Sequence, residues 1–137
     1  MDVIQLDTVR AKRMIQELDL DFVEQRLINV EGFTAERARE AIESYRNLLT
    51  LQVEYPSRAL APPLSADKAL HAHILHTKRY AEDMQTVFGR FLHHDPANTS
   101  EEARDFTRRA FLEHFGTTVD TFAMCLINVE TEARHAA

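Results

Sequence analysis

The chain has 137 residues, which is enough for one domain with a proper hydrophobic core. Hydrophobic residues make up 45% of the chain and charged residues 28%, a balance that is typical of folded proteins and argues against disorder. The formal net charge of −6 disfavours general nucleic-acid binding. The single cysteine excludes an internal disulfide and any metal site made of cysteines alone.

The expected compartment follows from the same counts. The first residues, MDVIQLDTVRAKR, contain no apolar core of signal-peptide type, and no apolar run approaches membrane-spanning length. With only one cysteine in the chain, we predict a cytoplasmic protein that does not contact a membrane.

The first half of the chain predicts three helices. Apolar residues at near-helical spacing indicate a helix over roughly residues 5–18. The stretch DFVE at 21–24 has the form of a capping box, in which Asp21 and Glu24 bond backbone N–H groups, and predicts a helix to about residue 30. Thr34 can cap a third helix that stops at Pro56, with Gln52 the one polar residue on its inward side. Residues 55–65, with three prolines, predict an extended connector.

The second half adds further helices. Ser65 can cap a helical region over residues 66–92, in which a break near Thr77 is left open. Another helix is expected from Ser100 to Gly116, and a last one from about 119 to 133, on the spacing of its apolar residues. The pentapeptide LINVE occurs at 27–31 and again at 126–130, which we interpret as coincidence because the flanking residues differ. The prediction is an all-α fold: one helical domain over residues 1–137, a compact bundle of five or six helices, with a histidine-rich segment at 65–96.

Five of the seven histidines lie within 24 residues of one another: His71, His73, His76, His93 and His94. On a regular helix His73 and His76 are close enough to share one ion, whereas His71 and His73 diverge. The two later histidines follow a glycine and precede Asp-Pro, so they are expected at or just past a helix end. A chain that folds back there would bring one of them toward the first group.

This cluster predicts a transition-metal site. Neutral imidazole is the commonest metal ligand, and two or three imidazoles with Asp67 or Asp95 suit zinc or non-haem iron. We take all five histidines as candidate ligands, with Asp67 or Tyr80 orienting a ligand imidazole from outside the coordination shell. No HExxH motif or zinc-finger spacing is present. Two alternatives stay open: histidines that only hydrogen-bond within the fold, and catalysis without a metal.

The segment around these histidines resembles a known family. Residues 45–96 resemble the glycine-rich domain-containing protein-like family and its short bacterial relatives, whose signature includes His-x-His-Ile-Leu-x-Thr-x-x-Tyr and His-His-x-Pro. The family's Trp, Cys and second aromatic are replaced here by Leu70, Met84 and Ala97. The resemblance implies that the segment matters, without implying a reaction. The matching positions are Asp67, His71, His73, Ile74, Leu75, Thr77, Tyr80, Asp83, Gly89, Phe91, His93, His94 and Pro96.

The functional prediction is a small cytoplasmic helical protein that binds zinc or, second, iron at its histidines. An open coordination position there could polarise a small substrate or activate water, but the sequence does not decide whether the protein is an enzyme. The alternative is a non-catalytic protein–protein interaction module in which the histidines are structural. The partner, a protein or a small molecule, and a homodimer both stay open. Cys125 lies in an apolar stretch and is expected to be a buried, inert thiol, with a Cys–His pair as the minor alternative.

Overall fold

The computed structural model describes residues 3–96 and 98–129, and in this part of the chain it contains six helices and a two-stranded sheet. The prediction of an all-α fold is confirmed, since the sheet has only two residues in each strand. The elements are α1 (Val3–Glu17), α2 (Asp21–Asn29), α3 (Ala35–Glu54), α4 (Leu64–Leu75), α5 (Thr77–Phe88), β1 (His94–Asp95), α6 (Glu101–Phe115) and β2 (Leu126–Ile127).

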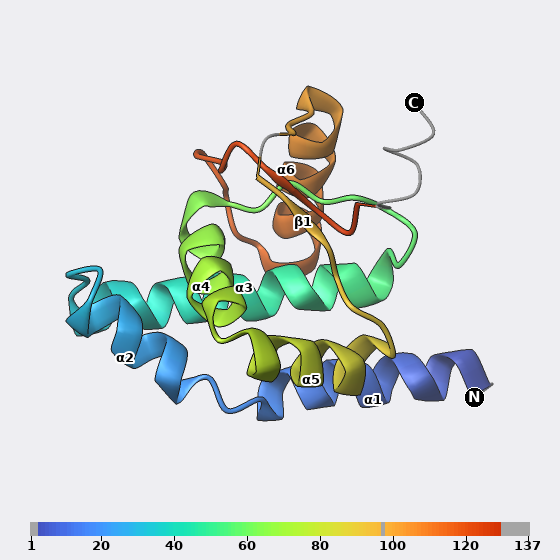
Figure 1. Cartoon of the computed structure of the whole chain (residues 1–137). Coiled ribbons are helices and arrows are strands. Elements are labelled where there is room, and N and C mark those ends of the chain that lie inside the picture. Colours follow the sequence, from blue (N-terminus) through green and yellow to red (C-terminus); the bar gives the residue numbers. More distant parts are fainter. Residues whose placement is uncertain (1–2, 97, 130–137) are drawn as a thin grey trace.

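The long helix α3 is the centre of the bundle. It contacts α1, α2, α4 and α6, and α4 also contacts α2 and α5. Figure 1 shows α1 and α5 side by side on one side of α3, with α6 on the other. The helix α4 therefore lies in the middle of the fold, where one of its faces must be buried.

Two helix starts follow from the sequence. Thr34 Oγ1 accepts a hydrogen bond from the backbone N–H of Arg37 at 3.1 Å, and Ser100 Oγ accepts one from Ala103 at 3.1 Å. Each bond satisfies a backbone donor that the first turn leaves free. At its other end α6 stops at Gly116, whose φ of 65° is left-handed.

Two other predicted caps are wrong. Asp21 does not form a capping box, because α2 begins after Leu20 and the carboxylate of Asp19 accepts from the backbone N–H of Asp21 instead. Ser65 does not cap α4 either, since that helix already begins at Leu64 behind Pro63.

The histidine-rich helix breaks at His76, which has φ −91° and ψ 72°. Its backbone N–H bonds the carbonyl of His73, while its side-chain Nδ1 donates to the carbonyl of Ala72 at 2.9 Å. The imidazole thus takes the acceptor that a continuous helix would give to the backbone N–H of His76. The break left open near Thr77 is real, and α4 and α5 point in different directions (Figure 1).

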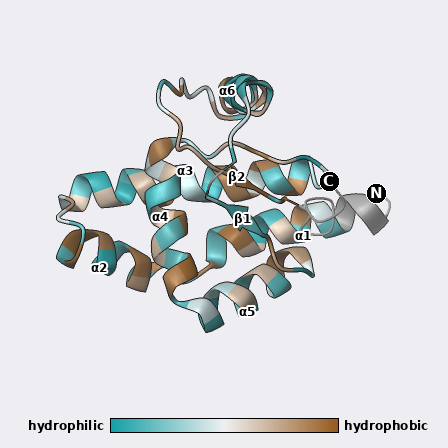
Figure 2. Cartoon of the chain, turned by 45° about the horizontal axis from the view of Figure 1, so that its top comes forward, coloured by the Kyte–Doolittle hydropathy of each residue, from teal (hydrophilic) through white to brown (hydrophobic). Residues whose placement is uncertain are grey.

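Hydrophobic and hydrophilic residues alternate around the helices (Figure 2), as amphipathic helices around one core require. The largest buried side chains include Tyr45, Tyr80 and Phe111. Gln52 is also fully buried, and its Nε2 donates to the carbonyls of Tyr55 and Arg58, both at 2.9 Å, where the chain leaves α3. In the described part of the chain, no helix combines the length and apolar character needed to cross a bilayer.

The predicted helix over 119–133 is wrong for residues 119–129, and residues 130–133 lie outside the described part of the chain. This segment is extended and bonds the connector before α4: Ala123 N–H bonds Pro62 O at 3.0 Å, and Leu60 and Ile127 exchange two backbone bonds. Its residues Leu126 and Ile127 form β2, antiparallel to β1. Residues 119–129 are extended because the connector before α4 offers them backbone carbonyls and N–H groups, which an extended segment can bond as an edge strand does.

Candidate metal centre

The helix α4 presents two potential ligands on one face. Asp67 and His71 are four residues apart, so their side chains lie one above the other. The side chain of Asp67 is 8% exposed and that of His71 is 49% exposed. The opposite face of the helix, with Ala69, Ala72 and His73, is buried in the core. The two ligand candidates therefore lie where the helix turns from core to surface.

His94 completes the group from a distant part of the chain. In β1 it pairs with Ile127, and this pairing holds its side chain against α4. The rings of His71 and His94 are 4.9 Å apart at their centroids, inclined by 77°. His94 Nε2 is buried and has no hydrogen-bond partner among the described residues. A buried imidazole nitrogen in that state is free to bind a metal ion.

The distances in this group suit a small metal ion. Asp67 Oδ1 lies 3.4 Å from His71 Nε2 and 3.7 Å from His94 Nε2. Ligands bound tetrahedrally at about 2.0–2.1 Å are roughly 3.4 Å from one another. The three candidate ligand atoms all lie within 4.8 Å of one another. An ion could therefore bind with only small side-chain movements.

The electrostatics keep Asp67 ionised. Burial is the largest influence and opposes ionisation, but the approach of His94, the hydrogen bond from Cys125 and the charge of His71 outweigh it and lower the pKa of Asp67 below 3.8. Cys125 Sγ donates to Asp67 Oδ1 at 3.1 Å. Burial, followed by that hydrogen bond and the nearby carboxylates, raises the pKa of the Cys125 thiol. The carboxylate is thus a charged oxygen donor facing two imidazoles and a thiol.

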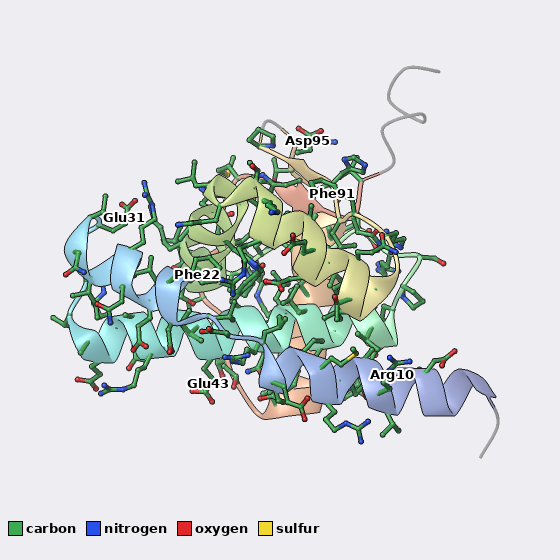
Figure 3. The ribbon with its side chains drawn as sticks, turned by 60° about the horizontal axis from the view of Figure 1, so that its bottom comes forward. Arg10, Phe22, Glu31, Glu43, Phe91 and Asp95 are labelled. Atoms are coloured by element: carbon green, nitrogen blue, oxygen red, sulfur yellow. The ribbon has the colours of Figure 1, made fainter. Side chains whose placement is uncertain are left out.

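His73 belongs to a separate group, on the core side of α4. It is fully buried, with Nδ1 2.7 Å from the hydroxyl of Tyr45 and Nε2 2.8 Å from Asp83 Oδ2. Because a carboxylate only accepts, Nε2–H donates to Asp83 and Nδ1 accepts from Tyr45. Figure 3 shows Phe22, which belongs to α2, on the side of that helix that faces α4 and α5. Its ring packs edge to face against the ring of His73, with the two ring centroids 5.7 Å apart. Both nitrogens of His73 are occupied.

Burial also shapes the pKa values in this second group. It lowers the pKa of His73 below 6.5, although the bond to Asp83 opposes that change. Burial, with the charges of Tyr80 and Asp83, raises the pKa of Tyr45 well above 10, and burial raises that of Tyr80. The group is therefore a hydrogen-bonded core of neutral rings around one carboxylate.

The five predicted histidines thus do not converge on one point. His71 and His94 lie together, with Asp67 between them as a candidate ligand as well as an orienting group. His76 lies at the helix break, and the exposed His93 packs against Phe91 with the two ring planes inclined by 60°. His73 and His76 both pack on Phe22 outside the Asp67 group, and the ring nitrogens that would share an ion are used in the fold, both of His73 by Tyr45 and Asp83 and Nδ1 of His76 by the carbonyl of Ala72. Tyr80 packs on His73 and donates to Leu92 O at 2.7 Å, so it orients no ring of the Asp67 group.

Sequence reasoning missed two kinds of residue. Tyr45 and Asp83 hold His73 from other helices, and although Asp83 was among the positions that match the resemblance, no contact of either residue with His73 was predicted. Cys125 is buried, as predicted, but its contact with Asp67 was not expected. The alternation of buried Ala123, exposed Met124 and buried Cys125 appears only in the structure, because all three residues are apolar and their sequence carries no strand-like signal.

Comparison with known proteins corrects the expected family. A model of the UCP032817-like family matches residues 10–115, which include Asp67, His71 and His94. The resemblance to the glycine-rich domain-containing protein-like family is therefore wrong. Searches of curated proteins and of solved structures gave no match. Since the matched residues make up well over half of the chain, it belongs to the UCP032817-like family.

Proposed function

We propose that the protein binds a divalent transition metal, zinc or iron, through Asp67, His71 and His94. The observation that carries the proposal is the convergence of one carboxylate oxygen and two imidazole nitrogens to within 4.8 Å, from α4 and from β1. Two imidazoles and a carboxylate form a donor set that suits both zinc and non-haem iron(II).

The surroundings of Asp67 support a cation at this position. Its contacts among the described residues are two imidazoles and a thiol, with no lysine or arginine. A buried carboxylate needs a compensating positive charge or several hydrogen bonds. A metal ion would supply that charge and also use the buried Nε2 of His94.

The chemistry of such a site depends on the fourth position. Three protein ligands leave room for a water molecule or a substrate atom. A metal bound here would act as a Lewis acid toward a carbonyl or phosphoryl oxygen, or lower the pKa of its water. Asp67, His71 and His94 hold the ion in this scheme, and the half-exposed His71 marks the side open to solvent.

The test is metal binding by untagged protein that has been stripped with a chelator. Calorimetric titration with Zn²⁺, and with Fe²⁺ under anaerobic conditions, should show stoichiometric binding that His94→Ala abolishes. The matched control is His93→Ala, which removes the neighbouring exposed imidazole outside the group. At free metal concentrations about 100 times Kd, binding should stabilise the fold by about 2.7 kcal/mol, and His94→Ala should lose this gain. An unaltered protein that binds neither ion, or an equal loss in both variants, would refute the proposal.

A further inference from the structure

Cys125 is the one neighbour of Asp67 that the proposed ligand set does not use. Its thiol donates to Oδ1, the same oxygen that faces both imidazoles. It comes from the extended segment before β2, beyond the residues that the family model matches. A buried sulfur beside a carboxylate and two histidines could have one of two roles. The first is to bind the metal, and the second is to hold the Asp67 carboxylate by a hydrogen bond.

The position of the sulfur favours the second role. Sγ lies outside the group of Asp67, His71 and His94, whose ligand atoms are all within 4.8 Å of one another. Ligand atoms around a tetrahedral ion with a thiolate would lie about 3.4–3.6 Å apart, from bond lengths of about 2.0–2.3 Å. The sulfur touches the carboxylate but stands too far from the imidazoles to share an ion with both of them.

The backbone holds the sulfur there. On one side of Cys125, the N–H of Ala123 bonds Pro62 O at 3.0 Å. On the other, Leu126 pairs with Asp95 in the sheet and Ile127 N–H bonds Leu60 O at 3.0 Å. These bonds fix the chain within two residues of the thiol on both sides, so the backbone of Cys125 cannot shift toward the imidazoles without breaking strand pairing.

We infer that Cys125 is a positioning residue, a thiol that orients the Asp67 carboxylate, and that the metal centre therefore has three protein ligands and an exchangeable position. This inference rests on the proposed function. A hydrogen bond to a ligating carboxylate fixes the direction of its free lone pair, as outer-sphere partners commonly do at metal sites. The exchangeable position would take water, hydroxide or a small anion. These can reach it beside His71, because that side chain is 49% exposed, whereas those of Asp67 and His94 are 8% and 12% exposed.

Cobalt(II) provides the test, because its absorption spectrum reports both its ligands and its geometry. The unaltered protein loaded with Co²⁺ should show ligand-field bands without the near-ultraviolet band of a cobalt–thiolate bond, and azide should shift the ligand-field bands. Cys125→Ser keeps a donor to Asp67 and should keep the Co²⁺ affinity and spectrum, whereas Cys125→Ala should weaken binding by about 10- to 100-fold. Circular dichroism of both variants would show that the fold is retained.

Each alternative outcome is distinct. A thiolate band that Cys125→Ser abolishes would make the sulfur a ligand, which overturns the inference and leaves the proposed function intact. Equal Co²⁺ affinity in all three proteins would also overturn it, since the thiol would then position nothing. Unaltered protein that binds no Co²⁺, Zn²⁺ or Fe²⁺ would refute the proposed function itself. Because the cobalt spectrum is measured on the unaltered protein, this part of the test does not depend on either variant folding.

Discussion

His71 and His73 are two residues apart on α4, yet they occupy opposite environments. Successive residues on a helix are about 100° apart, so these two side chains point roughly 200° from one another. The side chain of His73 is 0% exposed and that of His71 is 49% exposed. Both ring nitrogens of His73 have a hydrogen-bond partner. In His71, Nε2 faces the carboxylate of Asp67, and the ring lies beside that of His94.

The difference separates a structural histidine from the histidines of the proposed metal site. Around His73, Tyr45 and Asp83 satisfy the ring by strong, short hydrogen bonds, which leaves no lone pair for an ion. Around Asp67, the nitrogens lie at 3.4 and 3.7 Å, beyond ordinary hydrogen bonds but near the spacing of ligands around a metal. The number of histidines in a segment therefore does not by itself indicate a metal site. Ring nitrogens without a close hydrogen-bond partner are the better indication, because their lone pairs are available to an ion.

The sharpest test of this contrast is the pair His73→Ala and His71→Ala in metal-free protein. His73→Ala removes a fully buried ring and leaves the Tyr45 hydroxyl and the Asp83 carboxylate without their shared partner. We expect the free energy of unfolding, measured by urea denaturation, to fall by about 3–5 kcal/mol.

The control, His71→Ala, changes a half-exposed side chain and should alter stability by less than about 0.5 kcal/mol. It should nevertheless weaken metal binding. If both variants cost the same stability, the distinction between a core histidine and a ligand histidine would be wrong.

The repeated pentapeptide shows how far the sequence could predict the fold. LINVE at 27–31 spans the end of α2, whereas the same letters at 126–130 begin with β2. The first copy continues an amphipathic helix, with Leu27 in the core. The second lies beside an extended connector whose Leu60 bonds Ile127 in both directions. Local periodicity therefore predicted the helices that pack on α3, and failed where a distant segment supplied the hydrogen bonds.

The sequence prediction found part of the candidate site. It named Asp67, His71 and His94 among its candidates, but its helix-spacing argument paired His73 with His76 and did not pair Asp67 with His71. A chain that folds back after Gly89 was expected to return a histidine. Which histidine returns depends on the pairing of His94 with Ile127, which no local pattern encodes. The break at His76 likewise depends on a side chain competing for the carbonyl of Ala72. Contacts between segments decided which imidazoles could meet.

A smaller effect should appear at high pH, from the tyrosines of the His73 group, and the Cys125 thiol, whose pKa is also raised by burial, should add to it. The pKa values of Tyr45 and Tyr80 are raised in the folded protein, so stability from their protonated hydroxyls is complete below about pH 10 and is lost as pH rises from there toward the folded pKa values. Each tyrosine should remove about 1.4 kcal/mol per pH unit in this window. Urea denaturation between about pH 9 and 11.5, roughly the range in which tyrosines of the unfolded chain ionise, would measure this slope of stability against pH.

The variant Tyr80→Phe isolates one of the two contributions. It should lower stability at neutral pH by about 1 kcal/mol, because Leu92 O loses its donor, and it should make the alkaline slope shallower. The chain has three tyrosines and no tryptophan, so phenolate absorbance follows ionisation directly. A slope identical to that of the unaltered protein would show that Tyr80 ionises with the fold intact.

Replacing either aspartate by asparagine should have only a small effect on stability, and it separates the two groups by function. In Asp83→Asn the amide oxygen still accepts from His73, and the side chain is 17% exposed, so water can satisfy the new NH₂ group. The loss should be about 1 kcal/mol of stability, from a weaker, uncharged hydrogen bond, with Zn²⁺ affinity unchanged. Asp67→Asn should have the opposite profile: stability of the metal-free protein close to the original, and Zn²⁺ affinity lower by more than about tenfold, because the anionic donor is gone. Urea denaturation and Zn²⁺ titration of both variants would assign the Asp83 carboxylate to the core and the Asp67 carboxylate to the ion. An Asp83→Asn protein that lost Zn²⁺ binding would show instead that the two groups form one site.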